Sequence, residues 1–235
     1  INTTVTLSGS GSSTGSEFIY LWTTSDGTID SGDTTLDPVV SSGGTYTLLV
    51  INTNNGCDDL ISVTLVEDTT PPIADAGPGD ELTCAITEVV LLGTNSDVGP
   101  DFTYSWVTSD GNIVSGGTTL TPLVDEPGTY TIIVTNTLNG CTETDQVTIT
   151  EDINAPLADG GPILEINCNN PTVDLDGTGS SGGSNMFIQW TTSNGNIVNG
   201  ANTLTPTVDA GGTYFIEVTD ISNGCSSNSS TLVNA

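Results

Sequence analysis

The sequence contains no lysine, no arginine and no histidine. It contains 29 aspartate and glutamate residues, so the formal net charge at pH 7 is -29. Side-chain salt bridges are therefore excluded. Because no cation is present to neutralise phosphate, nucleic-acid binding and attraction to anionic membranes are also excluded.

The missing residue types also argue against an enzyme. Histidine and lysine supply the commonest general bases and amine nucleophiles. Paired carboxylates could still serve glycoside hydrolysis, but an active site repeated along small sandwiches would be unusual. We therefore expect no catalytic residues.

The sequence also lacks long apolar runs. No stretch of 18 apolar residues occurs, so we expect no membrane-spanning helix and no direct membrane insertion. Aromatic residues make up only 5% of the chain. Threonine, valine and isoleucine are abundant, alternate with polar residues, and are interrupted by 28 glycines. This composition is typical of β-sheets joined by many turns.

The most informative feature that is present is a repeat of 84 residues. It relates Trp22, Trp106 and Trp190, then Tyr46, Tyr130 and Tyr214, and then Cys57, Cys141 and Cys225. Cys84 and Cys168 follow the same period, which places their counterpart one position before Ile1. We expect three modules, at residues 1–68, 69–152 and 153–235, within a longer tandem array. The first module would then lack its first strand and first cysteine.

The middle repeat predicts an all-β, Ig-like sandwich. Phe102, Tyr104 and Trp106 alternate along one strand, and Asp110-Gly111 follows as a tight turn. Short strands recur at the spacing of an Ig-like fold, with one tryptophan mid-module and a tyrosine opening a late strand. We therefore assign core positions to the three tryptophans and the three tyrosines: Trp22, Trp106, Trp190, Tyr46, Tyr130 and Tyr214.

The five cysteines predict disulfides within the repeats. The simplest pairing joins Cys84 to Cys141 and Cys168 to Cys225, and it leaves Cys57 with a partner outside the sequence. Each bond would contribute about 3–4 kcal/mol by closing a loop, and would indicate an oxidising, extracellular setting. A zinc site would need cysteines or histidines clustered at short spacing, and none are.

The joints between repeats carry acids that recur in register. Glu67, Asp68 and Asp75 match the second set of acids, at Glu151, Asp152 and Asp159. Acids on a short extended joint without basic neighbours predict a Ca²⁺ site, which would need about six to eight oxygen ligands. The alternative is a solvated linker whose stiffness comes from proline alone.

The stretches Tyr104-Ser105-Trp106 and Gly128-Thr129-Tyr130-Thr131-Ile132 resemble PKD-type or PKD-like Ig domains. Together with Asn139-Gly140-Cys141 and the proline-bearing joint, they are most similar to tandem repeats of giant surface adhesins of gliding and marine Bacteroidetes-type bacteria. The resemblance covers almost all of each repeat. It implies an acidic, cysteine-stapled cell-surface protein exported by the type IX route and linked to gliding motility.

These features favour a structural role: the stalk of a long adhesin or extracellular filament, whose partners are neighbouring repeats of the same chain. The alternative is that each module weakly binds a glycan or a mineral surface and that repetition supplies avidity. A third hypothesis is a filament assembled through exposed edge strands.

Overall fold

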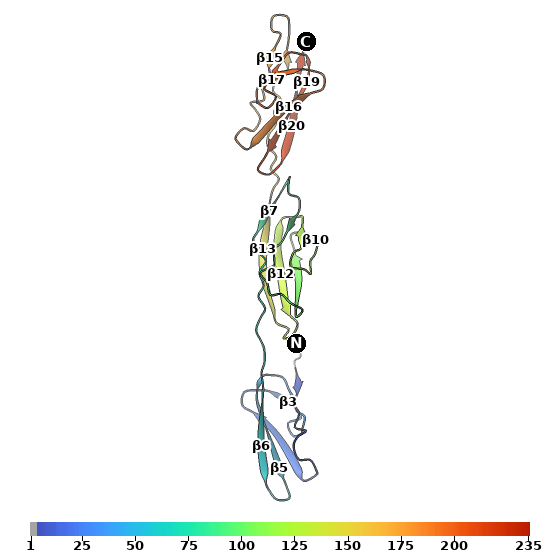
Figure 1. The fold of residues 1–235 in the computed structure, drawn as a ribbon, viewed down its shortest axis with the longest axis vertical. Coiled ribbons are helices and arrows are strands. Elements are labelled where there is room, and N and C mark those ends of the chain that lie inside the picture. The colour runs from blue at the N-terminus through green and yellow to red at the C-terminus, as the bar shows by residue number, and fades with distance from the viewer. Residues whose placement is uncertain (1–3) are drawn as a thin grey trace. The chain divides into compact units, whose positions relative to one another are not determined.

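The computed structural model describes residues 4–235, and these residues form strands and turns without a helix (Figure 1). None of them therefore provides a helix long and apolar enough to cross a membrane. The chain divides into two compact units. One comprises Ile1–Pro72, Pro100–Phe102 and Thr135–Thr142, and the other comprises Ile73–Gly99, Thr103–Val134 and Glu143–Ala235.

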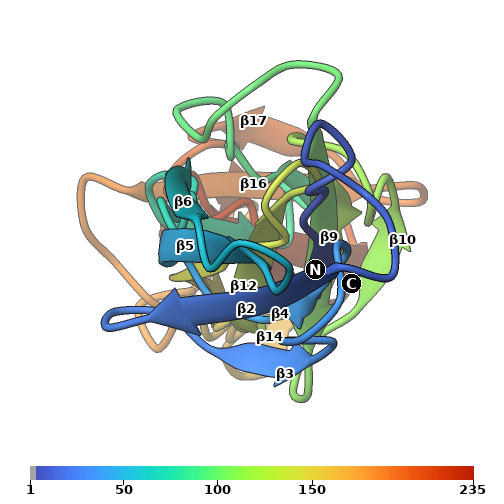
Figure 2. The same cartoon turned by 90° about the horizontal axis from the view of Figure 1, so that it is seen from below.

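The first sandwich contains two three-stranded sheets. One has the order β1-β4-β3 and the other β2-β5-β6, with all pairs antiparallel. Figure 2 shows β2 and β3, which belong to different sheets. The strands are β1 (Val5–Thr6), β2 (Phe18–Thr24), β3 (Ile29–Ser31), β4 (Val39–Val40), β5 (Gly44–Asn52) and β6 (Asp58–Leu65).

The second sandwich repeats this pattern and adds one strand. Its sheets have the orders β10-β11-β8 and β7-β13-β12-β9. The strands are β7 (Asp80–Thr83), β8 (Val89–Val90), β9 (Phe102–Thr108), β10 (Ile113–Ser115), β11 (Leu123–Val124), β12 (Gly128–Asn136) and β13 (Thr142–Asp152).

The third sandwich follows the second strand for strand, with sheets β15-β18-β17 and β14-β20-β19-β16. Its strands are β14 (Leu164–Glu165), β15 (Val173–Asp174), β16 (Met186–Thr192), β17 (Ile197–Asn199), β18 (Thr207–Val208), β19 (Gly212–Asp220) and β20 (Ser226–Asn234). The predicted fold class, tandem Ig-like β-sandwiches, is confirmed.

The opening strands pair in parallel with the closing ones. β7 runs beside the end of β13, with Thr83 opposite Asp152, and β14 runs beside the end of β20, with Glu165 opposite Asn234. Each opening strand therefore ends at the same end of its sandwich as the closing strand does. This register decides which cysteines can meet.

The tryptophans lie between the two sheets of their sandwiches. Trp22, Trp106 and Trp190 are 4%, 4% and 1% exposed. Each indole N–H donates to a main-chain oxygen thirteen residues further along the chain, at 2.9–3.1 Å. Because this bond satisfies the only polar group of the indole, the ring is buried without an unpaired donor.

The tyrosines close a turn in each sandwich. Tyr46, Tyr130 and Tyr214 are fully buried. The Tyr130 hydroxyl donates to the Glu126 carbonyl at 2.6 Å and accepts the Asn112 N–H at 3.0 Å. Burial raises the pKa of the Tyr130 phenol, and the hydrogen bond with the Asn112 main chain partly opposes that shift.

Candidate functional site: the joints between sandwiches

The acids at the two joints cap the main chain. Asp68 accepts the Thr70 N–H at 3.0 Å, and Asp152 accepts the Asn154 N–H at 3.1 Å. These hydrogen bonds lower the pKa of both carboxyls, because they favour the charged form. Each aspartate thus fixes the first turn of the chain that leaves the closing strand.

A second contact binds each joint to a turn further along the chain. The side-chain nitrogen of Asn139 donates to the Thr70 carbonyl at 2.9 Å, and that of Asn223 donates to the Asn154 carbonyl at 3.1 Å. Both asparagines open an Asn-Gly-Cys turn, in which their side-chain oxygens accept the cysteine N–H at 2.9 Å. The same arrangement therefore occurs at both joints.

Glycine is required within this turn. Gly140 and Gly224 have φ of 73° and 74°, in the left-handed region. A Cβ at Gly224 would also collide with the Cβ of Ala85, whose N–H donates to the Asn223 carbonyl at 3.2 Å. The turn thus presses its main chain against the end of β7.

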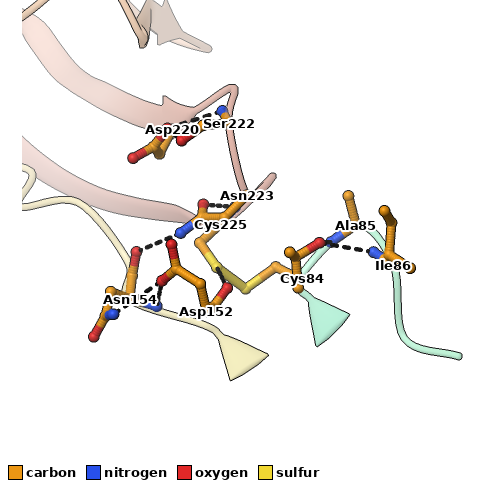
Figure 3. Close-up of a disulfide and its surroundings, with 10 residues drawn as sticks. Cys84, Ala85, Ile86, Asp152, Asn154, Asp220, Ser222, Asn223 and Cys225 are labelled. Atoms are coloured by element: carbon orange, nitrogen blue, oxygen red, sulfur yellow. Dashed lines mark hydrogen bonds between the residues drawn. A yellow bond between two sulfur atoms is a disulfide. The ribbon is translucent and has the colours of Figure 1, made fainter. Parts of the chain in front are cut away.

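A disulfide joins the second and third sandwiches at this point. Cys84, the residue after β7, bonds to Cys225, the residue before β20, across a sequence separation of 141. Figure 3 shows the bond beside Asp152 and Asn154 of the joint. Cys225 and Asn223 are 1% and 3% exposed, so these two side chains are buried although Gly224 between them is exposed.

The predicted pairing within repeats was therefore wrong. Cys84 does not bond to Cys141, and Cys225 does not bond to Cys168; Cys57, Cys141 and Cys168 are free thiols in the structure. The reason is the parallel register. Cys168 follows β14 at the far end of β20, whereas Cys225 precedes β20, so about eight strand residues, roughly 27 Å, separate them. A disulfide needs Cα atoms within about 7 Å.

The period alone could not distinguish the two pairings. Cysteines 57 residues apart in one repeat become 141 apart when one partner is taken from the next repeat, since 57 plus 84 is 141. The signal that decides between them is the parallel pairing of the opening strand with the closing strand, which carries Cys84 to the joint and is visible only in the structure. Cys84 and Cys225 are the functional residues whose pairing the sequence reasoning missed.

The structure does not gather the acids predicted to bind Ca²⁺. Among residues 4–235, no three side chains of aspartate, glutamate, cysteine or histidine converge to hold a metal ion. Asp75 and Asp159 instead accept the N–H groups of Gly77 and Gly161 at 2.7 and 2.9 Å. Glu67 and Glu151 are exposed. The carboxylates at the joint are thus occupied largely in fixing main-chain turns.

Comparison with known proteins gave only distant structural likenesses. No family model matches the chain. Among solved structures it is similar to three Ig domains of titin (10% identity, 94% of this chain and 88% of that one, TM-score 0.38). It is also similar to the insect immune protein hemolin (11%, 98% and 71%, 0.34) and to Drosophila N-cadherin EC1-4 (11%, 93% and 66%, 0.39). At these identities and scores the likeness carries no functional argument.

Proposed function

We propose that the chain is a load-bearing section of a stalk on a long adhesin or extracellular filament. The observation that supports this most directly is the Cys84–Cys225 disulfide, which connects one sandwich to the next instead of closing a loop within one. A second covalent connection reinforces a joint that is otherwise held by one strand of main chain and by hydrogen bonds such as that from Asn223 to the Asn154 carbonyl.

The bond changes how tension would pass along the chain. Force applied to the two termini enters at Cys84 and leaves at Cys225, so the main chain between these residues bears no load. That bypassed stretch includes most of the second and third sandwiches. At about 3.5 Å per residue, the separation of 141 residues corresponds to about 490 Å of chain that the disulfide keeps from extending.

The same register would apply to further repeats. In a longer array with the same period, the partners of Cys141 and Cys168 would be cysteines at position 0 and position 309, which are 141 residues away from them. Tension would then cross the disulfide at Cys141, follow the main chain to Cys168 and cross the next disulfide there. Only these 27 residues of main chain would bear the load in each stretch of two repeats, which is 168 residues. Much of that segment is the already extended strands β13 and β14, so such an array would stretch little.

Charge and compartment agree with this role. A net charge of -29 without a single cation makes neighbouring stalks repel one another and keeps them soluble. A disulfide that transmits tension must stay oxidised, and the oxidising compartments that allow this lie outside the cytoplasm. We therefore assign the chain to an extracellular or bacterial cell-surface structure, in line with its resemblance to PKD-like adhesin repeats.

Single-molecule pulling on the whole chain, attached through tags at both termini, tests the proposal. The oxidised protein should reach a final contour length about 490 Å shorter than the same protein in a thiol reductant. The double variant Cys84→Ser, Cys225→Ser should give the longer length without reductant, and Cys57→Ser should behave like the unchanged chain. Equal lengths for the oxidised and reduced proteins would refute the tether.

A further inference from the structure

Five asparagines in the sequence are followed directly by glycine: Asn55, Asn139, Asn194, Asn199 and Asn223. This dipeptide has a chemistry of its own. Because glycine has no side chain to hinder it, its nitrogen can attack the side-chain carbonyl carbon of the asparagine before it. The fold decides which pair can react, since hydrogen bonds can hold both the attacking nitrogen and its target.

Four of the five pairs have both groups held in hydrogen bonds. The side-chain oxygens of their asparagines each accept a main-chain N–H at 2.9 Å, from Cys57, Cys141, Thr213 and Cys225. The following glycines donate their N–H groups at 2.7–3.0 Å: Gly56 to Asn52, Gly140 to Asn136, Gly195 to Thr192 and Gly224 to Asp220. The nitrogen and the carbon that would react are therefore both fixed in these turns.

Asn199 and Gly200 differ from the other four pairs. The Asn199 side chain is exposed and has no hydrogen-bond partner within residues 4–235. The Gly200 N–H likewise donates to no acceptor in this part of the chain. Gly200 has φ of 71°, and a Cβ there would lie 3.0 Å from the Thr203 hydroxyl, so the turn requires glycine at this position.

The other two sandwiches form the same turn with serine in place of the asparagine. Their dipeptides are Ser31-Gly32 and Ser115-Gly116, whose glycines have φ of 77° and 72°. These glycine carbonyls accept the N–H of the threonine three residues on at 2.9 and 2.8 Å, as Gly200 does from Thr203 at 2.8 Å. The turn therefore does not need asparagine, and the third sandwich alone places a reactive amide in it.

We propose that Asn199 is a site of spontaneous deamidation and isomerisation. The Gly200 nitrogen loses its proton and bonds to Cγ of Asn199, the bond from Cγ to Nδ2 breaks, and ammonia leaves with that proton. Water then opens the succinimide ring. Attack on its side-chain carbonyl gives aspartate, whereas attack on its main-chain carbonyl gives isoaspartate, whose main chain is longer by one methylene. Water is the only co-reactant, and no redox step is involved.

The isoaspartate would disturb the loop that supports Trp190. Asn199 pairs with Thr207 between β17 and β18. The loop after it supplies both acceptors of the tryptophan: the Ala201 carbonyl for the main-chain N–H at 2.8 Å and the Thr203 carbonyl for the indole N–H at 3.0 Å. A methylene inserted between strand and loop shifts these acceptors out of line. Ageing of the chain would therefore weaken the third sandwich, whereas deamidation to aspartate adds only an exposed charge.

Incubation of the folded chain in mildly alkaline buffer tests the site. Peptide mapping with a protease that cleaves at acidic residues, read by mass spectrometry, locates each converted asparagine and separates aspartate from isoaspartate. We expect Asn199 to convert at least about tenfold faster than Asn194, because the Asn194 pair must first give up two hydrogen bonds. In denaturant, which removes these bonds, the five pairs should convert at similar rates.

Substitutions taken from the other repeats provide matched controls. Asn199→Ser should abolish the modification and keep the fold, because serine forms this turn in the first two sandwiches. Ser115→Asn should create a modified position in the second sandwich. Asn199→Asp separates the charge from the longer main chain: it should unfold at the same denaturant concentration as the unchanged chain, and the isoaspartate fraction at a lower one.

Three results would overturn the inference. They are conversion of Asn194 or Asn223 as fast as that of Asn199 in the folded chain, a Ser115→Asn chain that stays unmodified at this position, and unequal rates that persist in denaturant. An isoaspartate fraction as stable as the unchanged chain would overturn the consequence drawn for Trp190. The stalk proposal does not depend on these results, since Cys84 and Cys225 take no part in the reaction.

Discussion

The side chain of Asn223 recognises the main chain of Asn154, donating to its carbonyl oxygen at 3.1 Å. Asn139 does the same to Thr70 at 2.9 Å. Because the acceptor is a carbonyl, the joint residue itself is free to vary, and it is threonine in one repeat and asparagine in the next. The donor, by contrast, must be a side-chain amide at the position of Asn139 and Asn223, so this position is the constrained half of the contact.

Asn223→Asp should destabilise the third sandwich. The substitution keeps the oxygen that accepts the Cys225 N–H but removes the donor to Asn154 and adds a carboxylate near Asp152. We expect a loss of about 1–3 kcal/mol in the free energy of unfolding at pH 7. Chemical denaturation measures it, and the loss should shrink below about pH 4, where the new carboxyl is protonated. Asn228→Asp, which adds the same charge at an exposed site, should have little effect.

Tyr130→Phe should be more costly than Tyr104→Phe. Both tyrosines donate to a main-chain carbonyl, but Tyr130 also accepts the Asn112 N–H and is fully buried. Without the Tyr130 hydroxyl, the Asn112 N–H and the Glu126 carbonyl lose their hydrogen-bond partner. We expect the free energy of unfolding to fall by about 1–3 kcal/mol. Thermal unfolding of the two variants provides the measurement, and an equal effect at both positions would contradict the role assigned to the turn.

Stability should fall at high pH through Tyr130. Burial raises the pKa of this phenol above its unfolded value of about 10, so the unfolded chain loses the proton first. The stabilisation is complete below about pH 10 and is lost as pH rises towards the folded-state pKa. In denaturation between pH 8 and 11, the difference in stability between the unchanged chain and Tyr130→Phe should narrow as pH rises. A constant difference would show that Tyr130 does not titrate abnormally.

Thiol counting separates the two disulfide pairings. Alkylation of the unreduced, denatured monomer should add three groups, on Cys57, Cys141 and Cys168, and reduction should raise the number to five. Pairing within repeats would leave only Cys57 to react. Mapping can use a protease that cleaves at acidic residues, because trypsin has no site in a chain without lysine and arginine.

Calcium should not stabilise the joints. Asp68 and Asp152 each accept a main-chain N–H within their own turns, and no group of three ligands forms among the described residues. We expect the thermal midpoint to be the same with millimolar Ca²⁺ and with chelator, at an ionic strength high enough to screen the chain's charge. A saturable increase that Asp152→Asn removes would restore the calcium hypothesis.

Much of the fold could be predicted from the period of 84 residues. Comparing copies identifies positions where only one kind of residue is accepted, and Trp106 and Tyr130 are such positions because burial tolerates little change. The joint acids show the limit of the method. Asp68 and Asp152 recur in register, but recurrence does not reveal whether a carboxylate faces a metal or caps a main-chain N–H.

The sequence by itself determined the repeat length, the Ig-like strand pattern, the absence of every cation and the core aromatic positions. These follow from local alternation and composition, which need no knowledge of distant contacts. Only the tertiary structure decided that Cys84 bonds to Cys225. This bond depends on the parallel pairing of the opening strand with the closing strand, a long-range register that residue spacing does not encode.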